Sequence, residues 1–275
     1  RFSLVVHKYG VINVVRVKFK TVLILISVFF NVGMAKAEES NLAKLFSERN
    51  LKGTIIISSL DGKTEYLYNK ARAEKQFLPA STFKIPNTLI ALDERAVLNE
   101  KEIIKWDGKD KGWGPWNMDQ SLESAFPKSC VWFYQELAKR IGNINYLSHL
   151  DRLNYGNKKT GPEVTTFWLD GDLEISAREQ IDFLKTLYKE ELSYKKSYIQ
   201  LLKKLMIVDK NPQYTISAKT GWAMRINNQH GWYVGYVETD KKVWFFAINL
   251  DIVKKHDAIY RKEITMEALT IKGII

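Results

Sequence analysis

Strand-like sequence lies at both ends of the chain and helix-like sequence lies between them, and this order limits the possible folds more than any other feature. Near the amino end, the isoleucine-rich segment Gly53–Leu60 is followed by an Asp61–Gly62 turn and a second alternating segment, Lys63–Asn69, as in a β-hairpin. After Pro212, apolar residues again recur at every second position. The three segments with this period are Tyr214–Lys219, Gly231–Glu238 and Lys242–Leu250. Because isolated hairpins are rarely stable, we expect both ends to build one sheet.

Apolar residues three or four positions apart predict helices elsewhere. These helices are Glu38–Asn50, one beginning at Ser81, Trp132–Ile141, Tyr146–Leu153, one capped by Ser176 and Glu179, about Lys195 to Ile207, and His256 to about Ile271. We therefore predict an α/β protein of the α+β type. Its antiparallel sheet of about five or more strands is flanked by the N- and C-terminal helices, and an all-helical subdomain is inserted. We expect residues 38–275 to form a single domain, with the sheet part at 38–70 and 211–275 and the helical part at 71–210.

Residues 1–37 are interpreted as an upstream segment followed by a signal peptide. Lys18 and Lys20 precede the apolar run Thr21–Phe30, and an Ala-x-Ala site ends at Ala37. The run is too short for a membrane span, which needs roughly 20 apolar residues. We expect translation to start near Val17 and cleavage to follow residue 37. The product would be periplasmic or secreted, without a stable membrane anchor after cleavage.

Much of the formal net charge of +11 lies in this first segment. Removing residues 1–37 takes away six basic residues and no acidic ones, which leaves +5. The remaining basic residues are scattered over predicted helices, without a basic stripe interleaved with aromatic residues. Nucleic acid is therefore not an expected partner. A hydrophobic content of 45% is typical of a packed globular protein.

Cysteine and histidine are too sparse to predict a disulfide framework or a metal site. Cys130 is the only cysteine, so an intramolecular disulfide cannot form. After cleavage the remaining histidines are His149, His230 and His256, which lack an H-E-x-x-H spacing. A zinc hydrolase is therefore disfavoured, and we expect no metal.

The tetrad Ser81–Lys84 places a serine and a lysine on one face of the helix predicted to begin there. A serine hydroxyl is a poor nucleophile unless an adjacent base takes its proton, and a desolvated lysine amine can be that base. The alternative is an N-cap serine followed by a solvated lysine, which is the more common explanation of a lone S-x-x-K motif.

Four further features fall where a serine acyl-transfer site would need them. They are Ser129–Val131 at the start of a helix, Tyr155–Asn157 in a loop, Lys219–Gly221 at the end of a strand, and Arg261 on the last helix. A glycine at the end of a strand lets a ligand approach the backbone. Each feature also has an ordinary structural explanation: an N-cap, a loop turn, a chance turn sequence and a solvated helix face, respectively.

Taken together, these motifs resemble those of the class D serine β-lactamases, which are penicillin-recognising enzymes. The resemblance also includes Phe167–Leu169, Trp222 and Gly231–Gly235, and it extends from about Leu45 to Ile271. It implies a β-lactamase/transpeptidase-like fold and hydrolysis of the β-lactam ring of penicillin-type antibiotics, which confers resistance. The implied partner is a β-lactam substrate, and the protein would be a monomer or a homodimer.

The resemblance implies a chemical role for the first tetrad. Ser81 is the acylated nucleophile, and Lys84 is the general base in the form of N6-carboxylysine, made with carbon dioxide or bicarbonate; no other cofactor is implied. Burial beside Val131, Trp168 and Leu169 would lower the pKa of the amine and favour the neutral form that adds carbon dioxide. The indole N–H of Trp168 would hold the carbamate. A lysine modified in this way removes the need for a separate deacylating glutamate.

Further roles follow from the same resemblance. Ser129 would relay a proton to the leaving β-lactam nitrogen, helped electrostatically by Lys219. The backbone N–H groups of Ser81 and Trp222 would form the oxyanion hole.

Other matching residues are implied to bind the substrate. Thr220 and Arg261 would hold its carboxylate, with Arg261 as a forked donor. The full set of implied substrate-binding residues is Thr220, Gly221, Trp222, Arg261 and Tyr155.

Two rival functions remain open from the sequence. A penicillin-binding sensor domain of the same fold would be acylated without turnover, and a silent wall-binding module would not be acylated at all. Cys130 is expected to be a small buried hydrophobic residue. Trp113, Trp222 and Met224 along the expected cleft rim leave the substrate range open, including carbapenems and extended cephalosporins.

Overall fold

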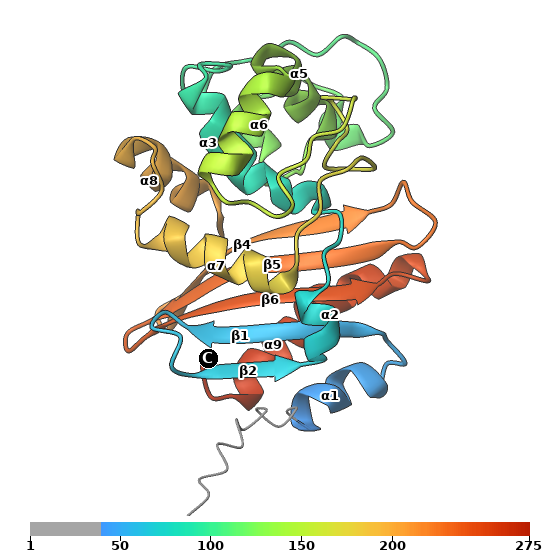
Figure 1. Ribbon diagram of the computed structural model, residues 1–275, viewed down its shortest axis with the longest axis vertical. Helices are drawn as coiled ribbons and strands as arrows, with labels where there is room; N and C mark the ends of the chain where they lie inside the picture. Colours follow the sequence, from blue (N-terminus) through green and yellow to red (C-terminus); the bar gives the residue numbers. More distant parts are fainter. Residues whose placement is uncertain (1–39) are drawn as a thin grey trace, which may run out of the picture. The chain divides into compact units, whose positions relative to one another are not determined.

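The strands from both ends of the chain form one antiparallel sheet in the computed structural model, which describes residues 40–275 (Figure 1). The order across this six-stranded sheet is β2, β1, β6, β5, β4, β3. The strands span Gly53–Ser59 (β1), Glu65–Tyr68 (β2), Ile207–Lys210 (β3), Tyr214–Ala223 (β4), His230–Thr239 (β5) and Val243–Asp251 (β6). The predicted α+β class and antiparallel sheet are therefore confirmed.

The pairing of β1 with β6 joins the two ends of the chain. Ile57 of β1 lies opposite Phe246 of β6, and both are fully buried. Side chains alternate between the faces of a strand. Accordingly, Ile55 and Ile57 belong to the hydrophobic core on one face of the sheet and Ile56 to the core on the other. Burial on both faces explains why β1 is a continuous apolar run rather than an alternating one.

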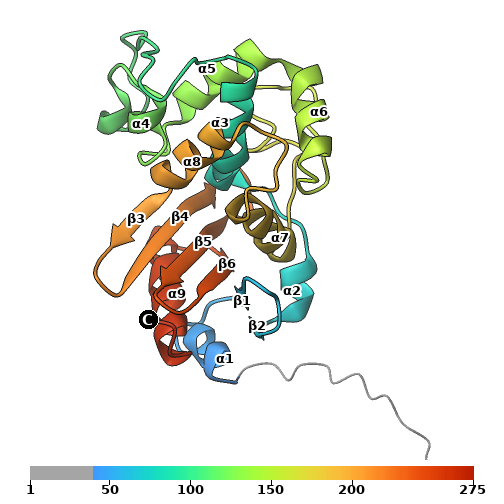
Figure 2. The ribbon, with the colours of Figure 1, turned by 90° about the vertical axis from the view of Figure 1, so that its left-hand side faces the viewer.

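Helices cover both faces of the sheet (Figure 2). The helices α1 (Ser40–Ser47) and α9 (Tyr260–Ile271) contribute Phe46 and Ile264 to the core on one face. The other face is covered by α7 (Ala177–Tyr188). The sequence predicts both flanking helices, although a short 3-10 turn precedes α9, so that helix begins four residues later than expected.

Helix α7 begins with the capping box that the sequence predicts. Ser176 Oγ accepts a hydrogen bond from the Glu179 N–H at 3.1 Å, and the Glu179 carboxylate accepts one from the Ser176 N–H at 2.7 Å. Ile181 and Leu184 of this helix are then buried against the sheet. A cap of this kind stabilises a helix start by about 1 kcal/mol.

Five further helices gather beyond the β4 side of the sheet (Figures 1 and 2). They are α3 (Lys84–Asp93), α4 (Leu122–Ala125), α5 (Val131–Ile141), α6 (Asn143–Arg152) and α8 (Lys196–Leu205). Every residue of α3 from Lys84 to Leu92 is buried, as is typical of a helix at the centre of its layer. The first turn of α3 therefore lies where the helical part meets the sheet.

Several elements differ from the sequence prediction. The helix expected to begin at Ser81 begins at Lys84, because a 3-10 turn holds Ser81, and α4 is not predicted. Strand β3 is not predicted, because all four of its residues are exposed and carry no alternating pattern. It is held at the edge of the sheet by pairing with β4, so the sheet part begins at residue 207 rather than 211, and the helix expected to reach Ile207 ends at Leu205. Helix α2 (Lys70–Glu74) lies where no helix is predicted, and Asn69 caps it by accepting from the Arg72 N–H at 3.2 Å.

The predicted signal peptide and cleavage site lie outside the described residues. Within residues 40–275, none of the helices is long and apolar enough to cross a membrane.

Candidate active site

Ser81 lies in a tight 3-10 turn, Ala80–Phe83, that leads directly into α3. The turn is closed by Thr82, whose N–H and Oγ1 both donate to the Pro79 carbonyl, at 3.1 and 2.7 Å. Ala80 has a φ of 49°, in the left-handed region that residues with a Cβ atom rarely adopt. Strained backbone of this kind occurs often at functional sites.

Lys84 is fully buried beneath Ser81. Its Nζ donates to Ser81 Oγ at 3.0 Å and lies 5.1 Å from the centre of the Tyr134 ring. Burial lowers the pKa of the Lys84 amine to about 7; charge on Cys130 would raise it, and the Arg225 charge lowers it further. A large share of the amine is therefore neutral at neutral pH and able to accept a proton from Ser81.

Trp168 has a buried indole N–H with no hydrogen-bond partner among the described residues. Its ring packs against Phe83, the neighbour of Lys84, with centroids 5.7 Å apart. A buried donor without an acceptor is unfavourable by about 1–3 kcal/mol. The donor therefore fits an acceptor group, such as a carbamate on Lys84, that the bare chain does not supply.

A second serine–lysine pair lies beside the first. Lys219 of β4 donates from Nζ to Ser129 Oγ and is almost fully buried. Burial lowers the pKa of Lys219 well below its ordinary value, and repulsion from Lys84 lowers it further. This coupling indicates that the two amines share one site.

Ser129 does not cap a helix, so that alternative explanation is wrong. Helix α5 begins at Val131, its N-cap residue is Cys130, and the cap lacks a side-chain hydrogen bond. Ser129 itself has a left-handed φ of 52°. This conformation and the bond from Lys219 leave its hydroxyl in the active site.

The end of β4 lies directly against the Ser81 turn. A Cβ atom added to Gly221 would lie 2.8 Å from the Pro79 carbonyl oxygen and 3.3 Å from the Thr82 nitrogen. Glycine is therefore required here by close approach of two backbones. This approach brings Thr220 and Trp222, on either side of Gly221, to the edge of the same site.

Arg261 of α9 reaches the end of β4 from the opposite face of the sheet. Its guanidinium donates to the Gly221 and Ala258 carbonyls and lies 6.0 Å from the Trp222 ring. Burial lowers its pKa to about 10. A Cβ atom on Gly231 would lie 2.5 Å from Arg261 Cδ, so this glycine leaves room for the arginine to pass. The solvated-face explanation of Arg261 is therefore wrong.

Tyr155 is placed differently from the other predicted site residues. Its ring is fully buried between Phe83, at 5.8 Å, and Phe183, at 5.1 Å. A completely buried ring supports the Ser81 turn from below rather than offering a surface to a substrate. Gly156 has a φ of 52°, and a Cβ there would lie 2.1 Å from the Glu174 carbonyl oxygen, which explains the glycine.

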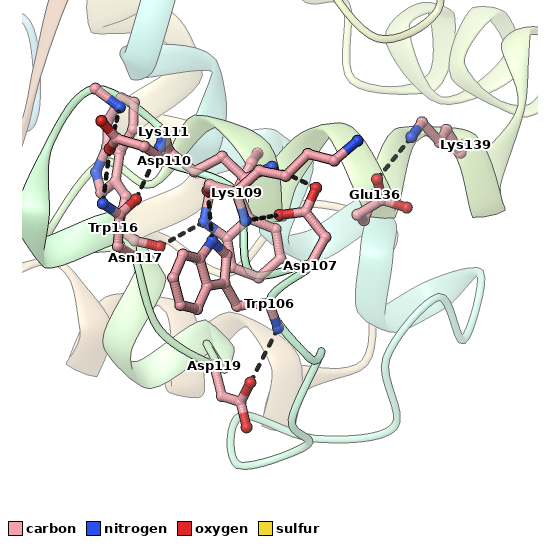
Figure 3. Close-up of polar contacts among 12 residues, drawn as sticks. Trp106, Asp107, Lys109, Asp110, Lys111, Trp116, Asn117, Asp119, Glu136 and Lys139 are labelled. Carbon is pink, nitrogen blue, oxygen red and sulfur yellow. Dashed lines mark hydrogen bonds and ion pairs between the residues drawn. The ribbon is translucent and has the colours of Figure 1, made fainter.

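The rim of the site includes a long loop, residues 106–119, that is ordered by its own carboxylates (Figure 3). Asp107 accepts from the Lys109 N–H, Asp110 from the Gly112 N–H, and Asp119 from the Trp106 N–H, at 2.9–3.1 Å. Nearby, the Trp116 indole donates to the Lys128 carbonyl and the Trp132 indole to the Trp116 carbonyl. Trp113 remains 48% exposed.

The aspartates of this rim loop should make its order sensitive to acid. Hydrogen bonds to Lys111, Asn117 and Lys105 lower the pKa of Asp107, Asp110 and Asp119, respectively, below the ordinary value of 3.8. A lowered carboxyl pKa stabilises the folded form above the ordinary pKa, and this stabilisation is lost as the pH falls through the lowered value.

We therefore expect the loop amides to lose protection as the pH falls below about 4. Hydrogen exchange measured by NMR between pH 5 and pH 3, corrected for the intrinsic exchange rate, should show this loss at Trp106, Lys109 and Gly112. The amides of Phe77 and Ile175, which bond to each other's carbonyls, serve as the control. Equal protection of the loop at both pH values would contradict the prediction.

Sequence reasoning missed two side chains at this site. Tyr134 lies under Lys84 and could have been found from its position one helical turn after Val131, on the same face. Arg225 pairs with Asp170 at 3.3 Å, which links the turn after β4 to the loop that follows Trp168. The sequence carries no signal for this second contact.

A cavity of about 680 Å³ opens beside Trp222 and Met224. Ser81 is not among the residues that line it.

Two serine–lysine pairs, gathered between an antiparallel sheet and a helical layer, define a serine acyl-transfer enzyme with a transpeptidase-type fold. A family model described as the penicillin binding protein transpeptidase domain matches residues 34–270. The chain belongs to the class D β-lactamases, as the curated relatives and solved structures below show.

Curated relatives match over most of their length. The chain is 40% identical to β-lactamase OXA-20 of Pseudomonas aeruginosa, over 92% of this chain and 96% of that protein. It is 41% identical to β-lactamase OXA-48 of Klebsiella pneumoniae, over 84% of this chain and 87% of that protein.

Solved structures agree with this assignment. The class D β-lactamase YbXI from Nostoc is 39% identical, with a TM-score of 0.83 over 86% of this chain and 99% of that one. The class D β-lactamase FUS-1 from Fusobacterium nucleatum is 36% identical, with a TM-score of 0.84 over the same shares.

Proposed function

We propose that this protein hydrolyses the β-lactam ring of penicillin-type antibiotics through an acyl-enzyme on Ser81. The observation that carries the proposal is the 3.0 Å contact between Ser81 Oγ and the buried Lys84 amine, whose pKa lies at about 7. A base with a pKa close to the working pH is suited to taking and returning a proton. The names of the curated relatives support the same substrate class.

In the proposed acylation step, the Lys84 side chain takes the Ser81 proton and Ser81 Oγ attacks the lactam carbonyl carbon. The carbonyl oxygen gains negative charge, which the backbone N–H groups of Ser81 and Trp222 would stabilise. The lactam C–N bond then breaks, and Ser129, held by Lys219, gives a proton to the leaving nitrogen. Ser129 receives in return the proton that Lys84 took from Ser81. Water completes the cycle by cleaving the ester.

The substrate would be oriented by its carboxylate. Arg261 lies at the end of β4, where its guanidinium already bonds to the Gly221 carbonyl. Thr220 immediately precedes Gly221 and offers a hydroxyl. A guanidinium and a hydroxyl together can bind a carboxylate through charge-assisted hydrogen bonds.

We further propose that Lys84 acts as N6-carboxylysine. The neutral amine is the form that adds carbon dioxide, and a pKa of about 7 makes it abundant at neutral pH. The unpartnered indole N–H of Trp168 would hold the added group. When present, a carbamate supplies a carboxylate-like base for both acylation and hydrolysis of the ester. Val131 and Leu169 would shield it from bulk solvent, with access only for the water that cleaves the ester.

We propose a periplasmic or secreted location, where such an activity confers β-lactam resistance. This part of the proposal rests on the basic, apolar and Ala-x-Ala pattern of residues 17–37.

Mass spectrometry of the purified protein after exposure to penicillin tests the proposed turnover. We expect one adduct on Ser81, with the mass of the intact penicillin, that disappears within minutes at neutral pH as water cleaves the ester. A persistent adduct would instead indicate a sensor domain, and a protein that never acquires an adduct would indicate a silent module. Either result would overturn the proposal.

A further inference from the structure

Two buried side chains of β5 donate to one carbonyl just before the nucleophile. His230 Nε2 and Trp232 Nε1 each lie 2.9 Å from the Leu78 carbonyl oxygen. Leu78 stands three residues before Ser81, and neither ring is open to solvent. On the basis of the proposed function, we propose that His230 is a positioning residue for Ser81, acting through the Leu78 carbonyl on the turn that aims the nucleophile.

The backbone between Leu78 and Ser81 needs such support. Ala80 holds a left-handed φ of 49° although it carries a Cβ atom, and a strained conformation persists only where its surroundings hold it. Pro79 has no N–H with which to form a backbone bond. Its carbonyl is fixed by Thr82 and faces Gly221 of β4. The Leu78 carbonyl is thus the fixed point on the other side of the strained residue.

The geometry determines the tautomer of His230, that is, which ring nitrogen carries the proton. A carbonyl oxygen can accept two hydrogen bonds, so both rings can donate at once, provided that the His230 proton is on Nε2. Burial lowers the pKa of His230, while bonds to the backbone of Leu78 and Asn228 oppose this shift. The charged groups that act on the ring are Arg72 and Asp251, which form an ion pair with each other at 2.6 Å.

The ring is also held laterally. Phe77 packs against His230 at 5.2 Å and against Trp232 at 6.3 Å between ring centroids. The backbone N–H of Phe77 donates to the Ile175 carbonyl, and the N–H of Ile175 donates to the Phe77 carbonyl. Because the rings are fixed from the side, the Leu78 carbonyl cannot move without breaking both hydrogen bonds. Loss of the His230 hydrogen bond would therefore let the turn shift and displace Ser81.

This placement predicts a specific kinetic effect. The side-chain hydrogen bonds of His230 and Trp232 go to the Leu78 carbonyl and not to Arg261 or Thr220, which would bind the substrate. Loss of this clamp on Leu78 should therefore slow attack by Ser81 and leave the affinity of the initial complex unchanged. A misplaced nucleophile can lose one to two orders of magnitude in rate.

The test compares His230→Leu with His230→Gln, because glutamine can present an amide N–H near the position of Nε2 whereas leucine cannot. Acylation by penicillin is followed by rapid-quench mass spectrometry. We expect His230→Leu to lower the acylation rate constant about tenfold, with the dissociation constant of the initial complex within about twofold of wild type. His230→Gln should recover most of the loss. Trp232→Phe, which removes the second donor, should also slow acylation.

The matched control is Tyr236→Phe, which removes a buried hydroxyl from the same strand away from the Ser81 turn. It should leave acylation unchanged. A wild-type rate in both His230→Leu and Trp232→Phe, or no recovery in His230→Gln, would overturn the proposal. If His230→Leu does not fold, Trp232→Phe decides the question. Absence of acylation in the wild type would instead refute the proposed function.

Discussion

Replacement of Ser81 by alanine is expected to lower kcat/KM for nitrocefin by about 10⁴-fold or more. Ser81 Oγ is the atom that carries the acyl group in the proposed mechanism, and Lys84 Nζ contacts it at 3.0 Å. The remaining groups of the site can still bind the substrate, so KM should change far less than kcat. Initial rates measured by nitrocefin absorbance, together with the thermal unfolding curve, give both quantities.

The matched control for this substitution is Ser47→Ala. Ser47 is exposed at the end of α1, where its hydroxyl donates to the Lys44 carbonyl of the same helix at 3.2 Å. Its removal should leave kcat/KM unchanged. Undiminished turnover in Ser81→Ala, with a normal unfolding curve, would show that another residue carries the acyl group.

Loss of the Lys84 amine is expected to be the second largest effect. Lys84→Ala should block acylation or trap the acyl-enzyme, because the same side chain is proposed to serve in both half-reactions. The expected loss of kcat is about 10³-fold or more. The substitution also leaves a cavity beneath Ser81, so the unfolding curve must accompany the rates. Full activity in a folded Lys84→Ala protein would exclude the lysine as the base.

Dependence on bicarbonate separates a carboxylated lysine from a plain amine. Degassed, bicarbonate-free wild type should lose rate and regain it on addition of bicarbonate. Trp168→Phe should raise the bicarbonate concentration needed for half-maximal rate about tenfold or more, because it removes the donor proposed to hold the carbamate. Phe245→Leu, a change at a buried ring that packs against Tyr188 and Tyr236 rather than against Trp168, should not. Rates independent of bicarbonate in both proteins would support the plain amine.

The strands that build the sheet core could be predicted from the sequence because burial imposes a pattern on them. The buried strand β1 reads as a run of isoleucines, and β5 and β6 are also apolar and buried along most of their length. The edge strand β3 carries no such pattern, because all its residues face solvent and only backbone pairing holds it. Patterns of burial cannot report an element that is not buried.

The site shows a similar division. The contact between Ser81 and Lys84 could be predicted from the sequence, because the two residues are only three positions apart at the start of a helix. The Ser129 and Lys219 contact joins residues 90 positions apart, and only the resemblance of motifs pointed to it. The burial of Tyr155 and the Arg225 contact with Asp170 depend on tertiary packing alone. For the same reason the clamp on Leu78 could not be found from the sequence.

The pairing of β1 with β6 also determines when the enzyme can become active. Ser81 and Lys84 are made early in synthesis, but Lys219, the end of β4 and Arg261 come from the last quarter of the chain. β1 has no neighbour but β2 until β6 emerges. Contacts between such distant segments form slowly. The complete site is therefore assembled only after nearly the whole polypeptide has been produced, and a fragment that ends before β4 carries Ser81 and Lys84 without Lys219 and Arg261.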